Sequence, residues 1–581
     1  MSKYDLIIRG GSVVDGTGGA PFRADVAIRG AVIAAVGDIQ GNADEEIDAN
    51  GMLVTPGFVD IHTHYDGQAT WESRTLPSSA HGVTTVMTGN CGVGFAPCRP
   101  ADREILVRLM EGIEDIPEVV MTEGLSWDWE SFPQFLDVID ARPRDIDIAT
   151  QLPHSCLRVF VMGERGAAGE RATPADLAVM ARLSEEAMRA GALGFGTSRS
   201  LFHRSSDGKA VPTKDAQEEE LKAIASGLKA AGHGVIQAIF DVLDEESLES
   251  GVRLLGRVAG HSGRPVSYTL VQLLTAPRDA WREALRVTGE INRSGVSMKA
   301  QVFCRPVGVL LGLELSFNPF VRRPTYVAMA SMPLADRVAR LRRPEVRKAI
   351  LSESPVEDGL AVLALLTRFD LMFVLGEAPN YEPAREESIA ARAARAGISA
   401  EEMAYDLLLE QDGKSVIILT AANYNAGNLD DVRDMLTDPN TLYGLGDGGA
   451  HYGMICDGSY PTFALTYWTR DRQTGAKLSL PDVVRGLSHD TAAAIGLHDR
   501  GIIAPGYKAD INIIDYSRLK LHPPRVVRDL PANGKRLIQD AEGFVATIVS
   551  GCVIQREGQP TDLLPGKLIR GPKSAPLGAR A

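Results

Sequence analysis

The chain has 581 residues, of which 44% are hydrophobic and 23% charged, and this composition is ordinary for a globular protein. A formal net charge of −14, without a basic stripe interleaved with aromatic residues, argues against a nucleic-acid surface. No apolar run reaches the ~18–20 residues of a membrane span, and the start lacks a signal-peptide pattern. The six cysteines form no disulfide framework. We therefore expect a reduced, cytoplasmic protein that binds neither nucleic acid nor membrane.

Both ends of the chain carry short alternating runs broken by Gly and Asp turn signals, which indicate β-strands. These runs are YDLIIRGGSVVDG and ADVAIRGAVIAAVGD near the start, and KADINIIDY and GFVATIVSGCVIQREG near the end. Because chain termini often lie close together, we expect residues 1–56 and 491–560 to form one small β-sandwich domain. The Pro-, Gly- and Lys/Arg-rich tail, 561–581, is expected to pack loosely or to wrap a neighbouring subunit.

Between the two ends, short apolar runs alternate repeatedly with helical patterns such as PADLAVMARLSEEAMRAG and EEELKAIASGLKAAG. The predicted strands are GFVDIHTH, VTTVMTGNC, DIATQLPH, ALGFGTSR, GVIQAIFD, VSYTLVQ, VSMKAQVF and LYGLGDGG. Such alternation predicts the α/β class, and eight strands favour a (β/α)8 TIM-like barrel over residues 57–490, the alternative being an open doubly wound sheet.

The segment 305–415 is too long to be an ordinary connection between the last two predicted strands. It contains good helical patterns, including LADRVARLRRPEVRKAILSE. We therefore expect an insertion that covers the pocket at the catalytic end and helps to select the substrate.

The stretch PGFVDIHTHYD places His62 and His64 two residues apart at the end of an apolar strand. Since a strand alternates its faces, both imidazoles project to the same side. Two buried imidazoles with no other role would have ring nitrogens that lack hydrogen-bond partners. The pair therefore favours a shared metal ion.

Two further residues end predicted strands on the same side of the domain, where barrel active sites gather. Cys91 ends the second strand and Asp447 the last, and thiolate and carboxylate complete a mixed set of zinc ligands. Each also has a simpler interpretation, because a lone cysteine is usually a small buried hydrophobe and an aspartate before Gly-Gly is usually a turn residue.

The stretches PGFVDIHTHYD, HGVTTVMTGNCGVGFAP, GDGGAH and LHDRGIIAPGYKADINIID resemble the amidohydrolase superfamily, and within it the D-aminoacylase (N-acyl-D-amino-acid deacylase) group. TGNCG is the most specific element, because this group places a cysteine thiolate where many relatives have a carboxylated lysine. The resemblance implies that Cys91 is a metal ligand, that His62 and His64 bind at one metal position, and that Asp447 contacts the metal and shuttles a proton.

The sequence departs from that pattern in the fifth and sixth strands, where such relatives usually contribute one histidine each. Here GVIQAIFD and VSYTLVQ contain none, and Ala238, Ile239, Tyr268 and Thr269 stand roughly where the ligands are expected. None is a usual zinc ligand. We therefore predict one metal ion per chain, preferably Zn²⁺ and otherwise another divalent metal.

Other polar residues follow the third, fourth and last strands and could complete the pocket. The loop GTSRSLFHRSSDG offers Arg199, His203 and Arg204, and guanidinium groups bind carboxylates in a bidentate fork. His203 could instead replace a lost metal ligand, and a solvated loop with satisfied charges is an equal alternative. His154 and His451 complete the predicted substrate-binding set.

The predicted reaction is hydrolysis of an amide C–N bond in an N-acyl (D-)amino acid or a related acyl-amide that bears a carboxylate. Metal-activated water would be the nucleophile, with Asp447 as general base and then general acid. The alternatives are a metal-dependent lyase or isomerase on the same fold and a metal-free, non-catalytic relative. The partner is a small-molecule substrate, and a homo-oligomer is a working hypothesis.

Overall fold

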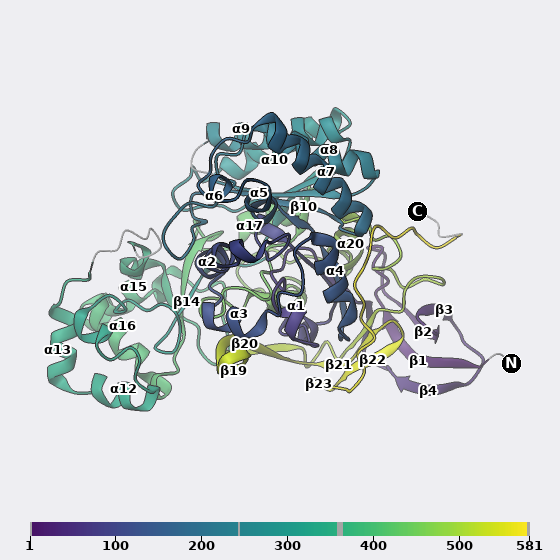
Figure 1. Cartoon of the computed structure of the whole chain (residues 1–581). Helices are drawn as coiled ribbons and strands as arrows, with labels where there is room; N and C mark the ends of the chain where they lie inside the picture. The colour runs from purple at the N-terminus through teal and green to yellow at the C-terminus, as the bar shows by residue number, and fades with distance from the viewer. Residues whose placement is uncertain (1–2, 242–244, 357–363, 578–581) are drawn as a thin grey trace.

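The computed structural model describes residues 3–241, 245–356 and 364–577. Strands from both ends of the chain form one sheet, in the order β23-β22-β21-β18-β5-β1-β2-β3, with β4 beside β1. The strands are β1 (Tyr4–Val13), β2 (Phe22–Arg29), β3 (Val32–Gly37), β4 (Ala43–Asp48), β5 (Leu53–Pro56), β18 (Ile511–Ile514), β21 (Phe544–Val549), β22 (Cys552–Arg556) and β23 (Gln559–Pro560). Antiparallel pairing of β5 with β18 joins the two ends, and Figure 1 shows the purple and yellow strands side by side.

The predicted strands of the central region are all present and run parallel to their neighbours, in two sheets. One sheet contains β6 (Phe58–Asp60), β7 (Val83–Thr88) and β8 (Asp147–Thr150). The other runs β17-β13-β12-β11-β10-β9, with β9 (Leu152–Pro153), β10 (Gly194–Arg199), β11 (Val235–Phe240), β12 (Val266–Thr269), β13 (Met298–Val302) and β17 (Thr441–Tyr443). The chain passes from one sheet to the other between β8 and β9, and a parallel bridge between Thr63 and Gly448 joins the segments that follow β6 and β17.

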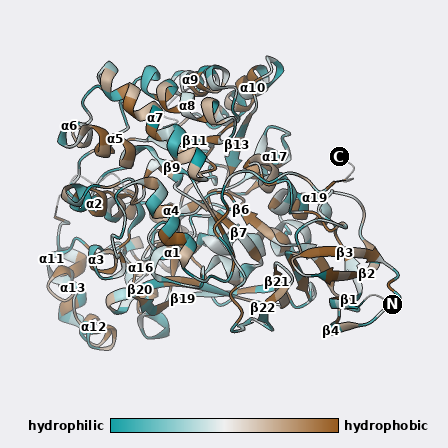
Figure 2. Cartoon of the chain, turned by 45° about the vertical axis from the view of Figure 1, so that its right-hand side comes forward, coloured by the Kyte–Doolittle hydropathy of each residue, from teal (hydrophilic) through white to brown (hydrophobic). Residues whose placement is uncertain are grey.

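Amphipathic helices connect successive strands of the larger sheet: α7 (Pro174–Ala190), α8 (Glu218–Ala231), α9 (Glu245–Ser262) and α10 (Ala280–Arg293). The helical patterns predicted at α7 and α8 are confirmed. Helix α7 begins after Thr173, whose hydroxyl and the Asp176 carboxylate form a reciprocal capping box. These helices lie together at the top of Figure 1, and Figure 2 shows that each carries both hydrophobic and hydrophilic residues. They pack their apolar faces against strands that are almost completely buried.

The long insertion forms a lobe with its own hydrophobic core, drawn in teal and green at the lower left of Figure 1. It contains an antiparallel sheet, with β16 (Ile417–Ala422) between β14 (Val307–Leu311) and β15 (Met372–Val374). Its helices include α11 (Pro324–Val327), α12 (Leu334–Leu341), α13 (Pro344–Ser352), α15 (Ile389–Ala396) and α16 (Ala400–Leu408). Because β16 completes this sheet, the lobe extends beyond the expected boundary at residue 415.

The C-terminal region holds two departures from the sequence-based expectation. A separate hairpin of β19 (Lys520–Leu530) and β20 (Gly534–Glu542) leaves the terminal sheet and reaches the α/β domain, where Leu537 donates to the Tyr452 carbonyl at 2.7 Å. The tail does not pack loosely over its described part, because the Ile569 amide donates to the carbonyl of Ile148 at 2.8 Å. Among the described residues, no helix is both long and apolar enough to cross a bilayer.

Candidate active site

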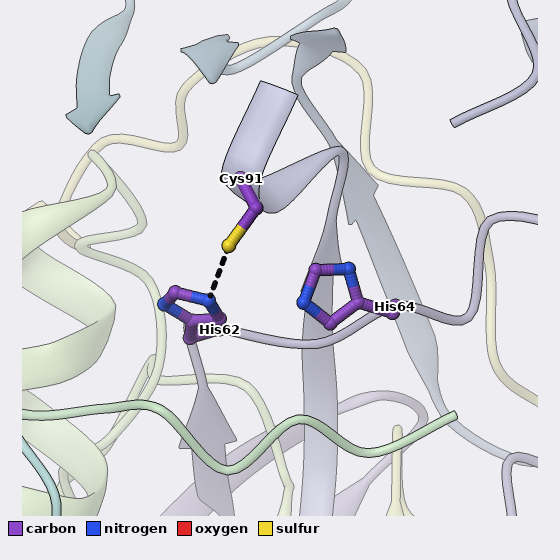
Figure 3. Close-up of side chains that lie close together, drawn as sticks. All are labelled: His62, His64 and Cys91. Carbon is purple, nitrogen blue, oxygen red and sulfur yellow. Dashed lines mark hydrogen bonds between the residues drawn. The ribbon is translucent and has the colours of Figure 1, made fainter. Parts of the chain in front are cut away.

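His62 and His64 lie just beyond β6, in a segment that is completely enclosed by the protein. Their side chains are 0% and 1% exposed, and their ring centroids lie 5.6 Å apart. The local backbone is held by the neighbouring segment, since the Asp447 amide donates to the His62 carbonyl at 3.0 Å and the His64 amide donates to Gly448 at 2.8 Å. The two imidazoles therefore approach each other at the C-terminal edge of the parallel strands, as predicted (Figure 3).

Cys91 joins the two histidines from a short helical turn after β7. Its sulfur lies 3.4 Å from His62 Nε2, the contact dashed in Figure 3, and donor atoms of all three residues lie within 4.8 Å of one another. Cys91 has a φ of 54°, a left-handed conformation that is uncommon for a residue with a side chain. Its amide is held by Gln237 Oε1 at 2.9 Å, so the strained backbone is fixed from β11.

Asp447 supplies the fourth donor from the segment that follows β17. Its Oδ1 atom lies 3.4 Å from His62 Nε2 and 3.5 Å from His64 Nε2. This oxygen is buried and has no hydrogen-bond partner among the described residues. A buried, unpaired carboxylate oxygen facing two imidazoles and a thiol is costly unless a cation lies between them, so the donor set fits a divalent metal such as zinc.

The electrostatics of the site favour a cation. Burial raises the pKa of the Cys91 thiol to about 12, so thiolate ligation requires a positive charge to offset the lost solvation. Burial by itself also raises the pKa of Asp447, but the close approach of His64 and the charges of the nearby histidines lower it to about 2. Asp447 is therefore ionised at neutral pH.

Two residues that the sequence analysis missed contact the outer nitrogens of the paired histidines. His62 Nδ1 donates to Gln301 Oε1 at 2.6 Å, and Gln301 Nε2 in turn donates to Ser267 Oγ at 2.9 Å. Glu114, the last residue of α2 (Arg103–Glu114), places Oε1 3.4 Å from His64 Nδ1. Burial raises the pKa of Glu114 to about 7. Such partners set the tautomer of a ligating histidine and leave its other nitrogen for the metal.

The sequence did hold signals for these residues. Glu114 follows Val107 and Met110 by seven and four residues, on the buried face of an amphipathic helix. A carboxylate at such a position needs a partner, which here is a pair of imidazoles. Gln237 and Gln301 likewise interrupt the apolar runs of β11 and β13.

The predicted substrate-binding residues differ in their surroundings. His451 Nε2 lies 3.4 Å from Glu114 Oε2, and both His203 and His451 lie within range of the charges of His62, His64 and Asp447. Burial is the main cause that lowers the pKa of His203 to about 3 and that of His451 to about 4. His203 Nδ1 lies 2.9 Å from Ser198 Oγ. Arg199 donates to the Ala216 carbonyl.

The remaining two predicted contacts, Arg204 and His154, differ in exposure and in their hydrogen-bond partners. Arg204 is exposed and donates to Gly208 O at 3.0 Å. His154 is 0% exposed, and both of its ring nitrogens are occupied, by Thr197 Oγ1 at 2.8 Å and Glu220 Oε1 at 2.9 Å. The expectation that His154 points into the pocket is therefore wrong, because this histidine is tied into a buried network between β10 and α8.

The fifth and sixth strands present neutral side chains at the positions where additional ligands were sought. On β11, Gln237 holds the Cys91 amide, while on β12 the Tyr268 hydroxyl pairs with Thr288 at 2.7 Å. Gln237 Nε2 and Thr269 Oγ1 are buried without a hydrogen-bond partner among the described residues. Neither strand supplies an imidazole.

The fold and the site together define a class of protein: an α/β enzyme whose donor set at the C-terminal edge of its parallel strands suits a divalent metal ion. The family follows from the sequence. The chain belongs to the amidohydrolase family, whose model matches residues 45–555.

Several relatives and solved structures are similar to this chain. An uncharacterized protein of Mycobacterium tuberculosis is 28% identical over 96% of this chain and 92% of its own length. A D-aminoacylase of Alcaligenes xylosoxydans xylosoxydans is 36% identical over a shorter stretch, 40% of this chain and 44% of that protein. A crystal structure of D-aminoacylase, described as defining a novel subset of amidohydrolases, superposes with a TM-score of 0.64 at 23% identity, covering 98% of this chain and 100% of the other. This last likeness supports the shared fold.

Proposed function

We propose that this amidohydrolase cleaves the amide C–N bond of an N-acyl amino acid, preferably of the D configuration, or of a related acyl-amide. The observation that carries the proposal is the convergence of donor atoms from His62, His64, Cys91 and Asp447. The partial sequence matches to D-aminoacylase, N-acyl-D-aspartate deacylase and N-acyl-D-glutamate deacylase support the substrate class. We further propose that the two parallel sheets form a (β/α)8 barrel.

The four donors would hold one divalent ion, with zinc favoured. A bound divalent ion would polarise the substrate carbonyl and lower the pKa of water. The related N-acyl-D-glutamate deacylase was crystallised with zinc, and D-aminoacylase is described with a binuclear metal centre. A single ion is proposed here because Gln237, Tyr268 and Thr269 occupy the strands from which further imidazoles would come.

Asp447 would perform the proton transfers. It is ionised, one of its carboxylate oxygens is unpaired, and it lies beside the predicted reaction centre. In this role Asp447 takes a proton from the attacking water and returns it to the departing amine. A carboxylate held rigidly between two imidazoles needs little reorganisation during these steps.

The substrate would lie beside His203 and His451, whose rings remain neutral and can donate or accept hydrogen bonds. Arg204 is the cationic candidate for a substrate carboxylate, because only one of its guanidinium nitrogens donates to Gly208. The insertion would form a wall of this pocket. Leu310 of the insertion donates to the Met454 carbonyl at 2.7 Å, close to His451 on the catalytic side of the sheets.

The proposal is tested by offering the zinc-, manganese- or cobalt-loaded protein a panel of N-acyl-D- and N-acyl-L-amino acids and measuring the amine released. Hydrolysis in ¹⁸O-labelled water should place one solvent oxygen in the carboxylate product. A lyase or isomerase would not incorporate solvent oxygen in this way. Metal-replete protein that releases no amine from any member of the panel would contradict the proposal.

A further inference from the structure

We propose that Glu114 is a positioning residue that holds the metal-site histidine His64 and the substrate-side histidine His451 in one fixed arrangement. This inference rests on the proposed metal-dependent function. It adds a residue from α2, a helix outside the parallel sheets, to the machinery of the site.

Glu114, at the end of α2, contacts histidines from two other segments of the chain. Its Oε1 lies 3.4 Å from His64 Nδ1, and its Oε2 lies 3.4 Å from His451 Nε2. Its own carbonyl accepts a hydrogen bond from the His451 amide. The carboxylate is 1% exposed. His64 Nδ1 and Glu114 Oε2 are buried and form no well-aligned hydrogen bond within the described residues, so both pairs are close electrostatic contacts. One buried side chain thus contacts both imidazoles through different oxygen atoms.

The end of α2 is fixed in this position by additional bonds. The next residue, Asp115, accepts from the Gly453 amide at 3.0 Å and from Ser316 Oγ at 2.9 Å. The segment that carries His451 is therefore anchored to the same end of the helix that carries Glu114. Glu114 is held rigidly enough to orient its partners.

The chemistry explains why this residue is a glutamate. His64 Nε2 faces Asp447 Oδ1 at 3.5 Å, so metal binding through Nε2 requires the proton on Nδ1, where Glu114 can accept it. A carboxylate can accept on both oxygens at once, whereas an amide has only one acceptor oxygen. Glutamine is sufficient at Gln301, which orients the single imidazole of His62. Glu114 faces two imidazoles and needs two acceptors.

A simpler alternative is that Glu114 only stabilises the fold as a buried ion-pair partner. Breaking a purely structural contact would weaken the metal-free protein and leave metal affinity unchanged. Loss of a positioning residue would lower metal affinity even in a fully folded protein. These two effects are measured separately.

The experiment compares the full-length variants Glu114→Gln and Glu114→Ala with Glu104→Gln, a matched control on the same helix whose carboxylate is 70% exposed. Zinc affinity is measured by competition with a chromogenic chelator, and the unfolding temperature of each metal-free variant is recorded. We expect zinc affinity to fall by about 10-fold for Glu114→Gln and about 100-fold for Glu114→Ala, the range found for residues that orient metal ligands. The control should stay within about twofold of the parent protein.

Parent-like zinc affinity in a folded Glu114→Gln variant would overturn the inference. A decrease in affinity that only parallels a lower metal-free unfolding temperature would also overturn it. The link to His451 is tested by the kcat/KM values of Glu114→Gln, His451→Asn and the double variant. Expressed as free energies, the effect of the double variant should be smaller than the sum of the two single effects. The zinc measurement needs no substrate, so it decides the role of Glu114 even if N-acyl amino acids are not hydrolysed.

Discussion

The hydrogen bond from His62 to Gln301 offers a sharp test of the site, because removing it leaves every metal donor in place. Replacing Gln301 by methionine keeps a side chain of similar length and deletes the acceptor that lies 2.6 Å from His62 Nδ1. In the metal-free variant, the imidazole can move its proton to Nε2, towards Asp447. In the metal-bound variant Nε2 would bind the ion, so the proton must stay on Nδ1. This buried N–H group is then left without an acceptor.

The expected loss of metal affinity follows from the burial of His62 and Gln301. Both His62 and Gln301 are essentially inaccessible to water, so no solvent molecule from the bulk replaces the lost acceptor. An unsatisfied buried donor costs about 1–3 kcal/mol, which corresponds to a decrease in metal affinity of about 5- to 150-fold. Replacing Ser267 by alanine should cost less, because Ser267 contacts only the far end of the amide and is partly accessible.

Zinc affinity of Gln301→Met and Ser267→Ala is measured against a chromogenic chelator, with circular dichroism as the control for folding. We expect the order parent, Ser267→Ala, Gln301→Met from the tightest to the weakest binding. A folded Gln301→Met variant that binds zinc within about twofold of the parent would refute the proposal that His62 ligates through Nε2 in the tautomer set by Gln301.

Three further outcomes are expected. Substituting both His62 and His64 by alanine should remove metal and activity together, and retention of a full metal complement, measured by elemental analysis, would contradict the ligand assignment. Asp447→Asn should lower kcat by about 10²–10⁴ even where metal still binds, whereas a near-parent rate would make Asp447 a turn residue only. Elemental analysis supported by anomalous diffraction should give about one metal per chain, and two ions per chain would refute the single-metal proposal.

The sequence predicted the parts of the site that follow directly from local pattern. Apolar runs alternating with helical stretches defined the parallel strands, and polar residues just past those runs had to gather at one edge. This reasoning identified His62, His64, Cys91 and Asp447, which the structure brings together. It failed for His154, because position after a strand does not show that a helix on the other side supplies a buried carboxylate partner.

The residues that orient the donors were missed because their contacts are remote in sequence. Gln301 lies 239 positions from His62, and no periodic pattern within β13 shows which strand faces it. A glutamine inside an apolar strand indicates only that some polar partner exists. Identifying the partner requires the order and register of the strands, which the sequence pattern alone does not provide.

The segment after Asp447 shows how elements remote in the chain combine to position a site residue. The amide of Leu310, in the insertion, donates to Met454, and the amide of Leu537, in the β19–β20 hairpin, donates to Tyr452, both at 2.7 Å. The two acceptors lie one and three residues after His451, whose own amide donates to the end of α2. Backbone bonds of this kind fix the loop whatever the side chains are. In the proposed arrangement, the insertion and the hairpin would vary the pocket wall through their side chains, while their backbone bonds hold the segment that carries His451.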